Sequence, residues 1–275
     1  MKIKYRNRRC GTKLHREFWK LAPLMMNLIV SIALVAAGLV VLGGLYLYAW
    51  SAPTLQVFAA AIVRGPAAGR RIALTFDDGP ASVFTEQILD ILYDRKVKAT
   101  FFVCGKNVER YPNIVRRIRA EEHALGNHTY SHSFLYFRSR RFMADEIDRT
   151  QEAVQKVTGE RPSIFRPPYG ARWLGLVAVL RKRGLRLVNW SDTGYDWKCG
   201  ADEIVRQTLK RLQPGSIILL HDGLETRSAR PIDQSATVRA LPAIINAASE
   251  AGLVFVTVND LLDEGLKEST ELRGN

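Results

Sequence analysis

The feature that most constrains the fold is an alternation of β-rich runs with amphipathic helical stretches from residue 71 onward. Runs rich in branched and aromatic residues are followed by stretches with apolar residues at helical spacing, which predicts repeated strand–helix units. Such units build a parallel sheet. The expected strands are 71–76, 97–103, 124–127, 163–165, 186–190, 216–220 and 253–256, and the expected helices are 85–95, 108–122, 142–157, 173–183, 202–212 and 237–250.

The number of strands limits the architecture further. Seven strands in about 190 residues are slightly few for a regular eight-fold barrel. The sequence therefore predicts an α/β fold, either as an irregular parallel (β/α) barrel or as an open sheet.

Five of the expected strands are followed at once by a polar cluster. In a parallel α/β fold the carboxyl ends of the strands lie on one face, where active sites are built. Clusters far apart in the sequence are therefore expected to meet in space. They are Asp77-Asp78-Gly79-Pro80, the segment from His128 to His132, the segment from Arg166 to Gly170, Asp192 with Asp196-Trp197, and His221-Asp222-Gly223.

Two of these clusters contain the elements of a metal site. Two imidazoles and one carboxylate leave a fourth position open for water. His128 and His132 are four residues apart, so a helical turn would bring both rings to one side. Asp77 and Asp78 can take different roles where the chain turns after a strand, although capping of a helix by an aspartate is the alternative.

A metal-activated water beside a carboxylate base is suited to hydrolysis. A leaving amine also needs an acid, and His221 is the candidate, with Asp196 to orient the imidazole and keep it protonated. A hydrogen-bonded core histidine is the alternative for His221. His15 and His123 lie outside the clusters and receive no role.

Five ordered motifs resemble those of the polysaccharide deacetylases, also called the NodB-homology domain or carbohydrate esterase family 4. They are Thr75-Phe-Asp-Asp-Gly-Pro80, His128-Thr-Tyr-Ser-His132, Arg166-Pro-Pro-Tyr-Gly170, Asp196-Trp197 and Leu219-Leu-His-Asp222. The resemblance covers residues 71–262. It implies a distorted parallel (β/α) barrel that removes N- or O-acetyl groups from sugars with one divalent metal, for which zinc is expected.

The resemblance also implies roles for residues of the first three motifs. Asp78, His128 and His132 would be the metal ligands. Asp77 would be the catalytic base, and Arg166 would hold that carboxylate in place.

The remaining motifs would complete the site. His221 would be the general acid, with Asp196 as its partner. The backbone N–H of Tyr169 would help to stabilise the oxyanion, and Leu219 and Trp197 would shape the acetyl pocket. None of these positions departs from the family pattern.

A long segment without charge precedes the predicted domain. Residues 1–20 carry eight basic residues and one acidic residue, about half of the net charge of +13, and residues 21–63 carry no charge. Residues 28–50 are long enough to span a bilayer, and the basic arm would keep the N-terminus in the cytoplasm and export the remainder. A cleaved signal peptide is the alternative, although its apolar region would be unusually long.

The expected organisation has five parts: a basic cytoplasmic arm (1–20), a transmembrane anchor (21–50), a linker (51–70), the deacetylase-like domain (71–265) and a polar tail (266–275). The arm is expected to set topology and contact anionic lipid rather than nucleic acid. Cys104 and Cys199 would be exported, where a disulfide is permitted, but the sequence does not decide whether they pair. It does not indicate an oligomeric state.

The leading functional hypothesis is a deacetylase of an envelope or extracellular glycan, such as peptidoglycan, a chitin-like oligosaccharide or an exopolysaccharide. One alternative is a deformylase or deacetylase of a lipid-linked sugar. Another is an inactive glycan-binding module, whose usual signature is a broken catalytic position. The five motifs do not identify the glycan.

Overall fold

The computed structural model describes residues 12–51, 61–173, 175–223 and 233–263, and the chain divides into two compact units, Met1–Ala49 and Trp50–Asn275. The described residues of the first unit all belong to one helix, α1 (Thr12–Ser51), which has an apolar stretch at Pro23–Leu47 with a mean hydropathy of 2.7. At 1.5 Å per residue these 25 residues extend about 37 Å, more than the hydrocarbon thickness of a bilayer. The expected N-terminal apolar helix is therefore present, and it begins earlier than residue 21.

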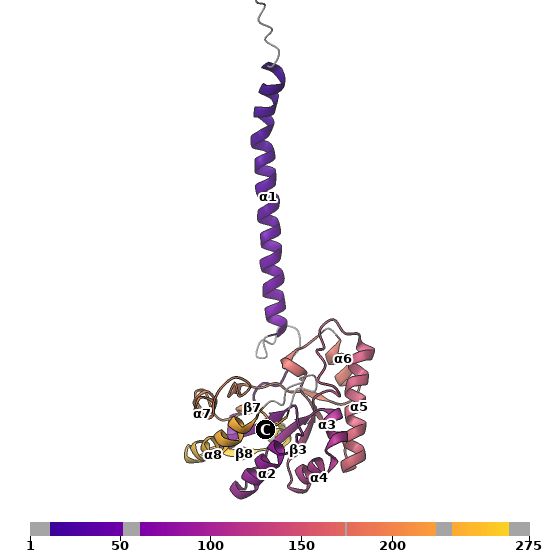
Figure 1. The fold of residues 1–275 in the computed structure, drawn as a ribbon, viewed down its shortest axis with the longest axis vertical. Helices are drawn as coiled ribbons and strands as arrows, with labels where there is room; N and C mark the ends of the chain where they lie inside the picture. Colours follow the sequence, from indigo (N-terminus) through magenta and orange to yellow (C-terminus); the bar gives the residue numbers. More distant parts are fainter. Residues whose placement is uncertain (1–11, 52–60, 174, 224–232, 264–275) are drawn as a thin grey trace, which may run out of the picture. The chain divides into compact units, whose positions relative to one another are not determined.

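The second unit is an α/β fold on one curled parallel sheet (Figure 1). The strand order is β5-β4-β3-β2-β1-β7-β6, with β8 also paired to β1. The predicted parallel sheet is confirmed, because every pairing between these strands is parallel. The strands are β1 (Arg71–Asp77), β2 (Thr100–Val103), β3 (Ala124–Asn127), β4 (Ile164–Phe165), β5 (Arg186–Leu187), β6 (Asp192–Thr193), β7 (Ile217–His221) and β8 (Val254–Val256).

Helices connect the strands. One predicted helix and one predicted strand differ from the observed elements. The predicted helix 108–122 is two helices, because the chain leaves helical geometry at Tyr111 (φ −127, ψ 55) and Pro112 begins the second helix, where its missing N–H is not needed. The predicted strand 186–190 is shorter in the structure. The sequence does not predict the next strand, β6, because a strand of two residues is too short to show an alternation of apolar and polar side chains. The α-helices after α1 are α2 (Phe84–Arg95), α3 (Gly105–Arg110), α4 (Pro112–Ala120), α5 (Arg140–Thr158), α6 (Leu176–Arg181), α7 (Ala201–Leu209) and α8 (Ser235–Glu250).

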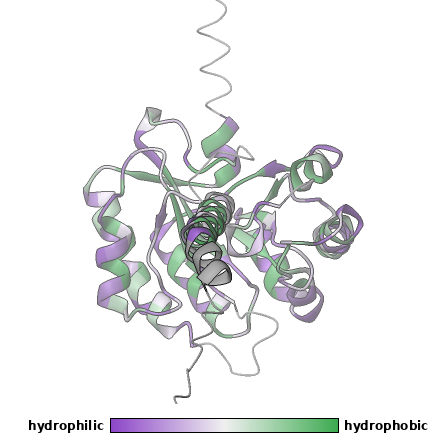
Figure 2. Cartoon of the chain, turned by 90° about the horizontal axis from the view of Figure 1, so that it is seen from above, coloured by the Kyte–Doolittle hydropathy of each residue, from purple (hydrophilic) through white to green (hydrophobic). Residues whose placement is uncertain are grey.

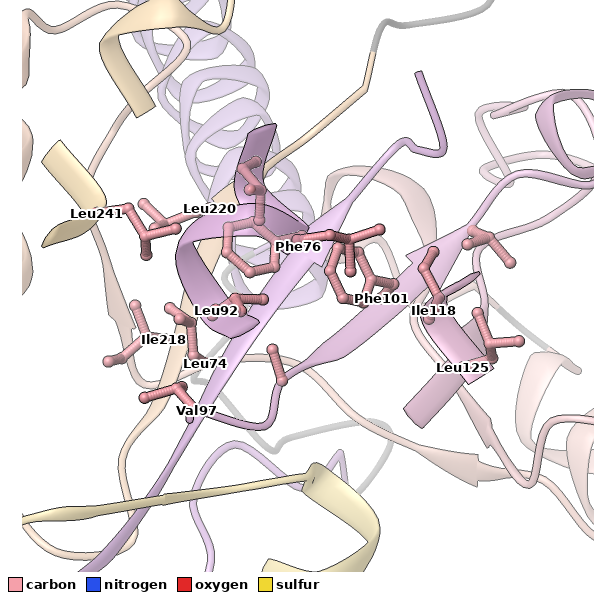
Figure 3. Packing of buried hydrophobic residues seen from close by; sticks show 14 of the residues in the cluster. Leu74, Phe76, Leu92, Val97, Phe101, Ile118, Leu125, Ile218, Leu220 and Leu241 are labelled. Carbon is pink, nitrogen blue, oxygen red and sulfur yellow. The ribbon is translucent and has the colours of Figure 1, made fainter. Parts of the chain in front are cut away.

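Strand β1 is the centre of the sheet. It pairs with β7 on one side, and with β8 and then β2 along the other. Its side chains Leu74 and Phe76 enter a core beneath the surrounding helices, where the Phe76 and Phe101 rings stack at 5.1 Å (Figure 3). Helices around the sheet change from hydrophobic to hydrophilic across their width (Figure 2), as expected of helices with one buried face.

Residues 61–65, expected to be part of the linker, are built into the domain. Ile62 donates to the Leu187 carbonyl and accepts from Asn189 N–H, both at 2.8 Å, while the Gly65 N–H donates to the Gly215 carbonyl at 2.8 Å. The segment therefore joins the end of β5, at one edge of the sheet, to the start of β7, which lies next to the other edge strand, β6. Only 52–60 of the predicted linker lies outside the described residues, as do residues 1–11 and the tail 266–275.

This bridge predicts that domain stability depends on residues 61–65. A fragment of residues 66–275 is expected to have a free energy of unfolding about 3 kcal/mol below that of residues 61–275, since each lost backbone hydrogen bond contributes about 1 kcal/mol. Urea denaturation of both fragments measures the difference. Equal midpoints and slopes would show that the bridge adds nothing.

Candidate active site

The site begins at the end of β1 with a buried ion pair. Oδ1 of Asp77 accepts a hydrogen bond from Nη1 of Arg166 at 2.7 Å, and neither side chain is appreciably exposed. The same guanidinium donates to the Thr75 hydroxyl at 2.7 Å and to the carbonyl oxygens of Val188 and Asn189. Every edge of Arg166 is therefore occupied, which fixes the orientation of the Asp77 carboxylate.

The next residue leaves the strand and turns its side chain into the same space. Asp78 has φ 74, so the alternation of an extended chain is broken and two adjacent carboxylates reach one cavity. Gly79 is required here, since a Cβ would lie 2.2 Å from a carboxylate oxygen of Asp222. Helix α2 begins at Phe84 with Val83 before it, so neither aspartate caps that helix.

Asp78, His128 and His132 form a buried group whose ligand atoms lie within 4.8 Å of one another. Nε2 of His128 and Nε2 of His132 lie 3.2 and 3.0 Å from Oδ1 of Asp78. Nδ1 of His128 lies 2.8 Å from the Arg166 carbonyl, which can only accept, so Nδ1 carries the hydrogen and Nε2 presents a lone pair. Two imidazole nitrogens that converge on one buried carboxylate oxygen fit a single divalent metal ion.

Electrostatics support this arrangement. Burial opposes ionisation of Asp78, but the two imidazoles hold the pKa of this carboxyl well below its ordinary value. One buried carboxylate and two imidazoles are a donor set that suits zinc and similar divalent ions.

The histidines lie on an irregular loop and not on the helical turn considered above. Thr129 and His132 have φ 66 and 54, so the chain coils tightly without forming a helix. The loop is held by Glu146 of α5, whose carboxylate accepts from the backbone N–H groups of Tyr130 and Ser131 at 3.1 and 2.9 Å. These contacts place both rings in spite of the irregular backbone.

Opposite the histidine pair, His221 and Asp196 form a second unit. Nδ1 of His221 lies 2.8 Å from Oδ1 of Asp196, whose Oδ2 accepts from the His221 backbone N–H at 2.7 Å and from the Thr237 hydroxyl at 2.9 Å. Burial alone would lower the pKa of His221, but the charge and hydrogen bond of Asp196, with the charges of Asp78 and Asp77, raise it to about 10. The imidazole is therefore protonated at neutral pH.

The two units meet at a cavity of about 400 Å³. In the register of β1 and β7, Asp77 is paired directly with His221. Arg166 and Asp196 lie behind the cavity and act on it through Asp77 and His221. The cavity is lined by Asp77, Asp78, His128, His132, Tyr169, Trp190, Trp197, Leu219, His221 and Gln234.

Two groups of residues escaped the sequence interpretation. Trp190 and Gln234 line the cavity without belonging to a predicted motif. Glu146 carried a signal, because an acidic residue three positions after Met143 falls on the apolar face of its helix.

Cys104 and Cys199 are both free, so the structure contains no disulfide between them.

The fold and the site together define an α/β protein whose carboxylates and histidines gather at the carboxyl ends of its strands. Residues 64–188 match the family model described as polysaccharide deacetylase. A peptidoglycan-N-acetylglucosamine deacetylase of Bacillus cereus is 40% identical over 195 residues, which cover 70% of this chain and 69% of the relative. A chitooligosaccharide deacetylase of Bradyrhizobium sp. is 38% identical over 189 residues, 66% of this chain and 86% of the relative.

Solved structures agree with these sequences. The crystal structure of a peptidoglycan N-acetylglucosamine deacetylase in complex with 4-naphthalen-1-yl-N-oxidanyl-benzamide superposes with a TM-score of 0.69 at 37% identity, covering 74% of this chain and 92% of that one. The chain belongs to the polysaccharide deacetylase family, carbohydrate esterase family 4, and is an enzyme of this class.

The raised pKa of His221 predicts a pH-dependent contribution to stability. Its folded pKa of about 10 exceeds the unfolded value of 6.5, so the contribution is fully present below pH 6.5 and is lost as the pH rises through 10. In Asp196→Asn the main favourable partner is gone, and the pKa of His221 is expected to fall. The difference in free energy of unfolding between the wild type and this variant should therefore decrease as the pH rises from 6.5 to 10, as measured by urea unfolding.

The ring of His221 offers a direct check. Its NMR resonance should still report the protonated form at pH 8 in the wild type and the neutral form in Asp196→Asn. An unchanged titration midpoint in the variant would contradict the role of Asp196.

Proposed function

We propose that this enzyme removes N-acetyl groups from amino sugars of an envelope glycan, with peptidoglycan as the leading substrate. The observation that carries the proposal is the meeting of the Asp77 carboxylate and the protonated His221 across one cavity beside a three-residue metal site. Amide hydrolysis needs a base for the attacking water and an acid for the leaving amine.

Asp78, His128 and His132 would hold one divalent cation, and we propose zinc. Such an ion, when bound, lowers the pKa of water and polarises a carbonyl group. The remaining steps fall to side chains of the chain itself.

Asp77 is proposed to take a proton from the attacking water, whose oxygen forms a bond to the acetyl carbon. Arg166 orients that carboxylate through the 2.7 Å contact. His221 then donates a proton to the sugar nitrogen as the carbon–nitrogen bond breaks, so that acetate and a free amine leave. Asp196 occupies Nδ1 of His221, which leaves Nε2 as the atom that delivers the proton.

Other lining residues are proposed to position the acetyl group. Leu219 and Trp197 offer apolar surface in the cavity, and the Trp197 ring meets His221 edge-on at 5.4 Å between centroids. Tyr169 has φ 60, a conformation that sets the direction of its backbone N–H, which we assign to the oxyanion.

Substrate choice is inferred from the relatives and from the N-terminal helix. The relatives named above act on peptidoglycan and on chitooligosaccharides, and the helix favours an envelope polymer over a free oligosaccharide. Hydrolysis of a lipid-linked sugar remains the second candidate, favoured only by the same helix.

Acetate release tests the proposal. The full-length chain in detergent should release acetate from peptidoglycan and, less well, from chitin oligomers. A chelator should abolish this release and zinc should restore it. Asp77→Asn should lower kcat about 10³-fold, within the range for loss of a general base.

Asp145→Asn, an exposed change on α5, is the matched control and should leave the rate unchanged. Acetate release by Asp77→Asn at the wild-type rate would overturn the assignment of the base. Consumption of a short lipid-linked substrate with no release from either polymer would favour the second candidate.

We also propose that α1 anchors the enzyme in a membrane, with the N-terminus in the cytoplasm and the catalytic domain outside. Apolar side chains between Leu21 and Leu47 are exposed along this helix, which water would not favour. The full chain should stay with membranes in alkaline carbonate, whereas the 61–275 fragment should be released. A secreted, soluble form whose N-terminus lies near residue 51 would show that the segment is a signal peptide.

A further inference from the structure

A row of aromatic side chains leads out of the catalytic cavity, and its residues are Tyr169, Phe134, Tyr136, Phe137 and Trp173. Tyr169 lines the cavity and its ring lies 5.0 Å from that of the metal-site residue His132. Successive centroids are then 5.7 Å (Tyr169 to Phe134), 4.8 Å (Phe134 to Tyr136) and 6.3 Å (Tyr136 to Phe137). The aromatic row is therefore a continuous extension of the cavity wall.

Much of the row faces solvent. Phe137 is 76% exposed, Tyr169 51% and Phe134 44%. The Phe137 ring also packs on Trp173 at 4.7 Å, so it is supported from one side and open on the other. Exposed aromatic rings are costly in water, and a contiguous group of them marks a binding surface.

Three arginines follow the row directly in the sequence. Arg138, Arg140 and Arg141 are exposed, and none of the ion pairs found among the described residues involves them. Arg138 lies over the Phe142 ring at 4.8 Å, and Arg140 packs on the backbone of Gly175, beside Trp173. Arg140 and Arg141 also begin α5, where a positive charge is disfavoured by the helix dipole, so they do not serve helix stability.

We propose that the aromatic row and these three arginines bind carboxylate-bearing sugar units that flank the sugar being deacetylated. This inference rests on the proposed function, because a polymer whose acetyl group enters the cavity must lie across its rim. Ring faces suit the C–H faces of pyranose units, and guanidinium groups suit carboxylates such as those on the lactyl and peptide groups of peptidoglycan. A neutral chitin-type chain would use the row without the arginines.

An anionic membrane is the other occupant that this chemistry would admit, since interfacial surfaces also combine aromatic and basic side chains. The continuity of the row with the cavity wall favours the glycan. No such continuity is needed for lipid contact.

The test compares two glycan strands of equal length on the full-length chain in detergent, one neutral and one carrying carboxylates, together with a disaccharide. In Phe137→Ala, kcat/KM should fall about three- to tenfold on both long strands and less on the disaccharide. In the double variant Arg138→Gln/Arg141→Gln, kcat/KM should fall about tenfold on the carboxylate-bearing strand alone, and added salt should shrink the difference from wild type.

Matched controls lie near the amino ends of the strands, away from the site. Tyr93→Ala removes a 70% exposed ring from α2, and Arg211→Gln removes an exposed charge before β7. Both should stay within about twofold of wild type on every substrate, a change of roughly 0.4 kcal/mol. If Phe137→Ala and the double arginine variant match these controls on the long strands, the proposed surface is wrong.

Two further readouts separate the alternatives. Weaker binding of the variants to anionic vesicles with unchanged glycan kinetics would assign the surface to the membrane and overturn the proposal. Strand binding is also measured by calorimetry, without turnover. If the wild type binds the charged strand, loses that binding in the variants and releases no acetate, the deacetylase assignment fails while the binding surface stands.

Discussion

The buried ion pair between Arg166 and Asp77 is the interaction on which the rest of the site depends. Arg166 follows β4, and its partner Asp77 ends β1, three strands away in the sheet order. In a flat sheet these strands would be roughly 14 Å apart, too far for one arginine side chain. The contact therefore requires a curled sheet. Breaking it would leave a buried charge uncompensated, which typically costs about 3–5 kcal/mol.

Each ionisable group in the cavity has a partner of its own. This pairing allows carboxylates and a protonated imidazole to lie within one small cavity. Asp77 has Arg166, Asp78 has two imidazoles, and His221 has Asp196. Each of these groups lies close to its partner, and all of the side chains are largely buried. Asp222, behind Gly79, shows the opposite outcome, since burial and the nearby Asp78 raise its pKa to about 7 despite a hydrogen bond from Thr85.

The proposed metal-binding histidines and three of the rings proposed to contact substrate lie on one stretch of chain. The loop that carries His128 and His132 continues directly into Phe134, Tyr136 and Phe137 and then into α5. Glu146 of that helix returns to hold the loop backbone. His128 and His132 and three rings of the aromatic row therefore lie on one loop, which Glu146 of the following helix holds at Tyr130 and Ser131.

The sequence by itself determined the parallel α/β class, the apolar helix and most residues around the cavity. The periodicity of apolar residues and the position of polar clusters after strands are local properties, which can be recognised in the sequence alone. It did not reveal the bridge of residues 61–65, the strand β6, the irregular histidine loop or the lining residues Trp190 and Gln234. These depend on contacts between distant segments. Curling of the sheet creates those contacts, and no local pattern records how far a sheet curls.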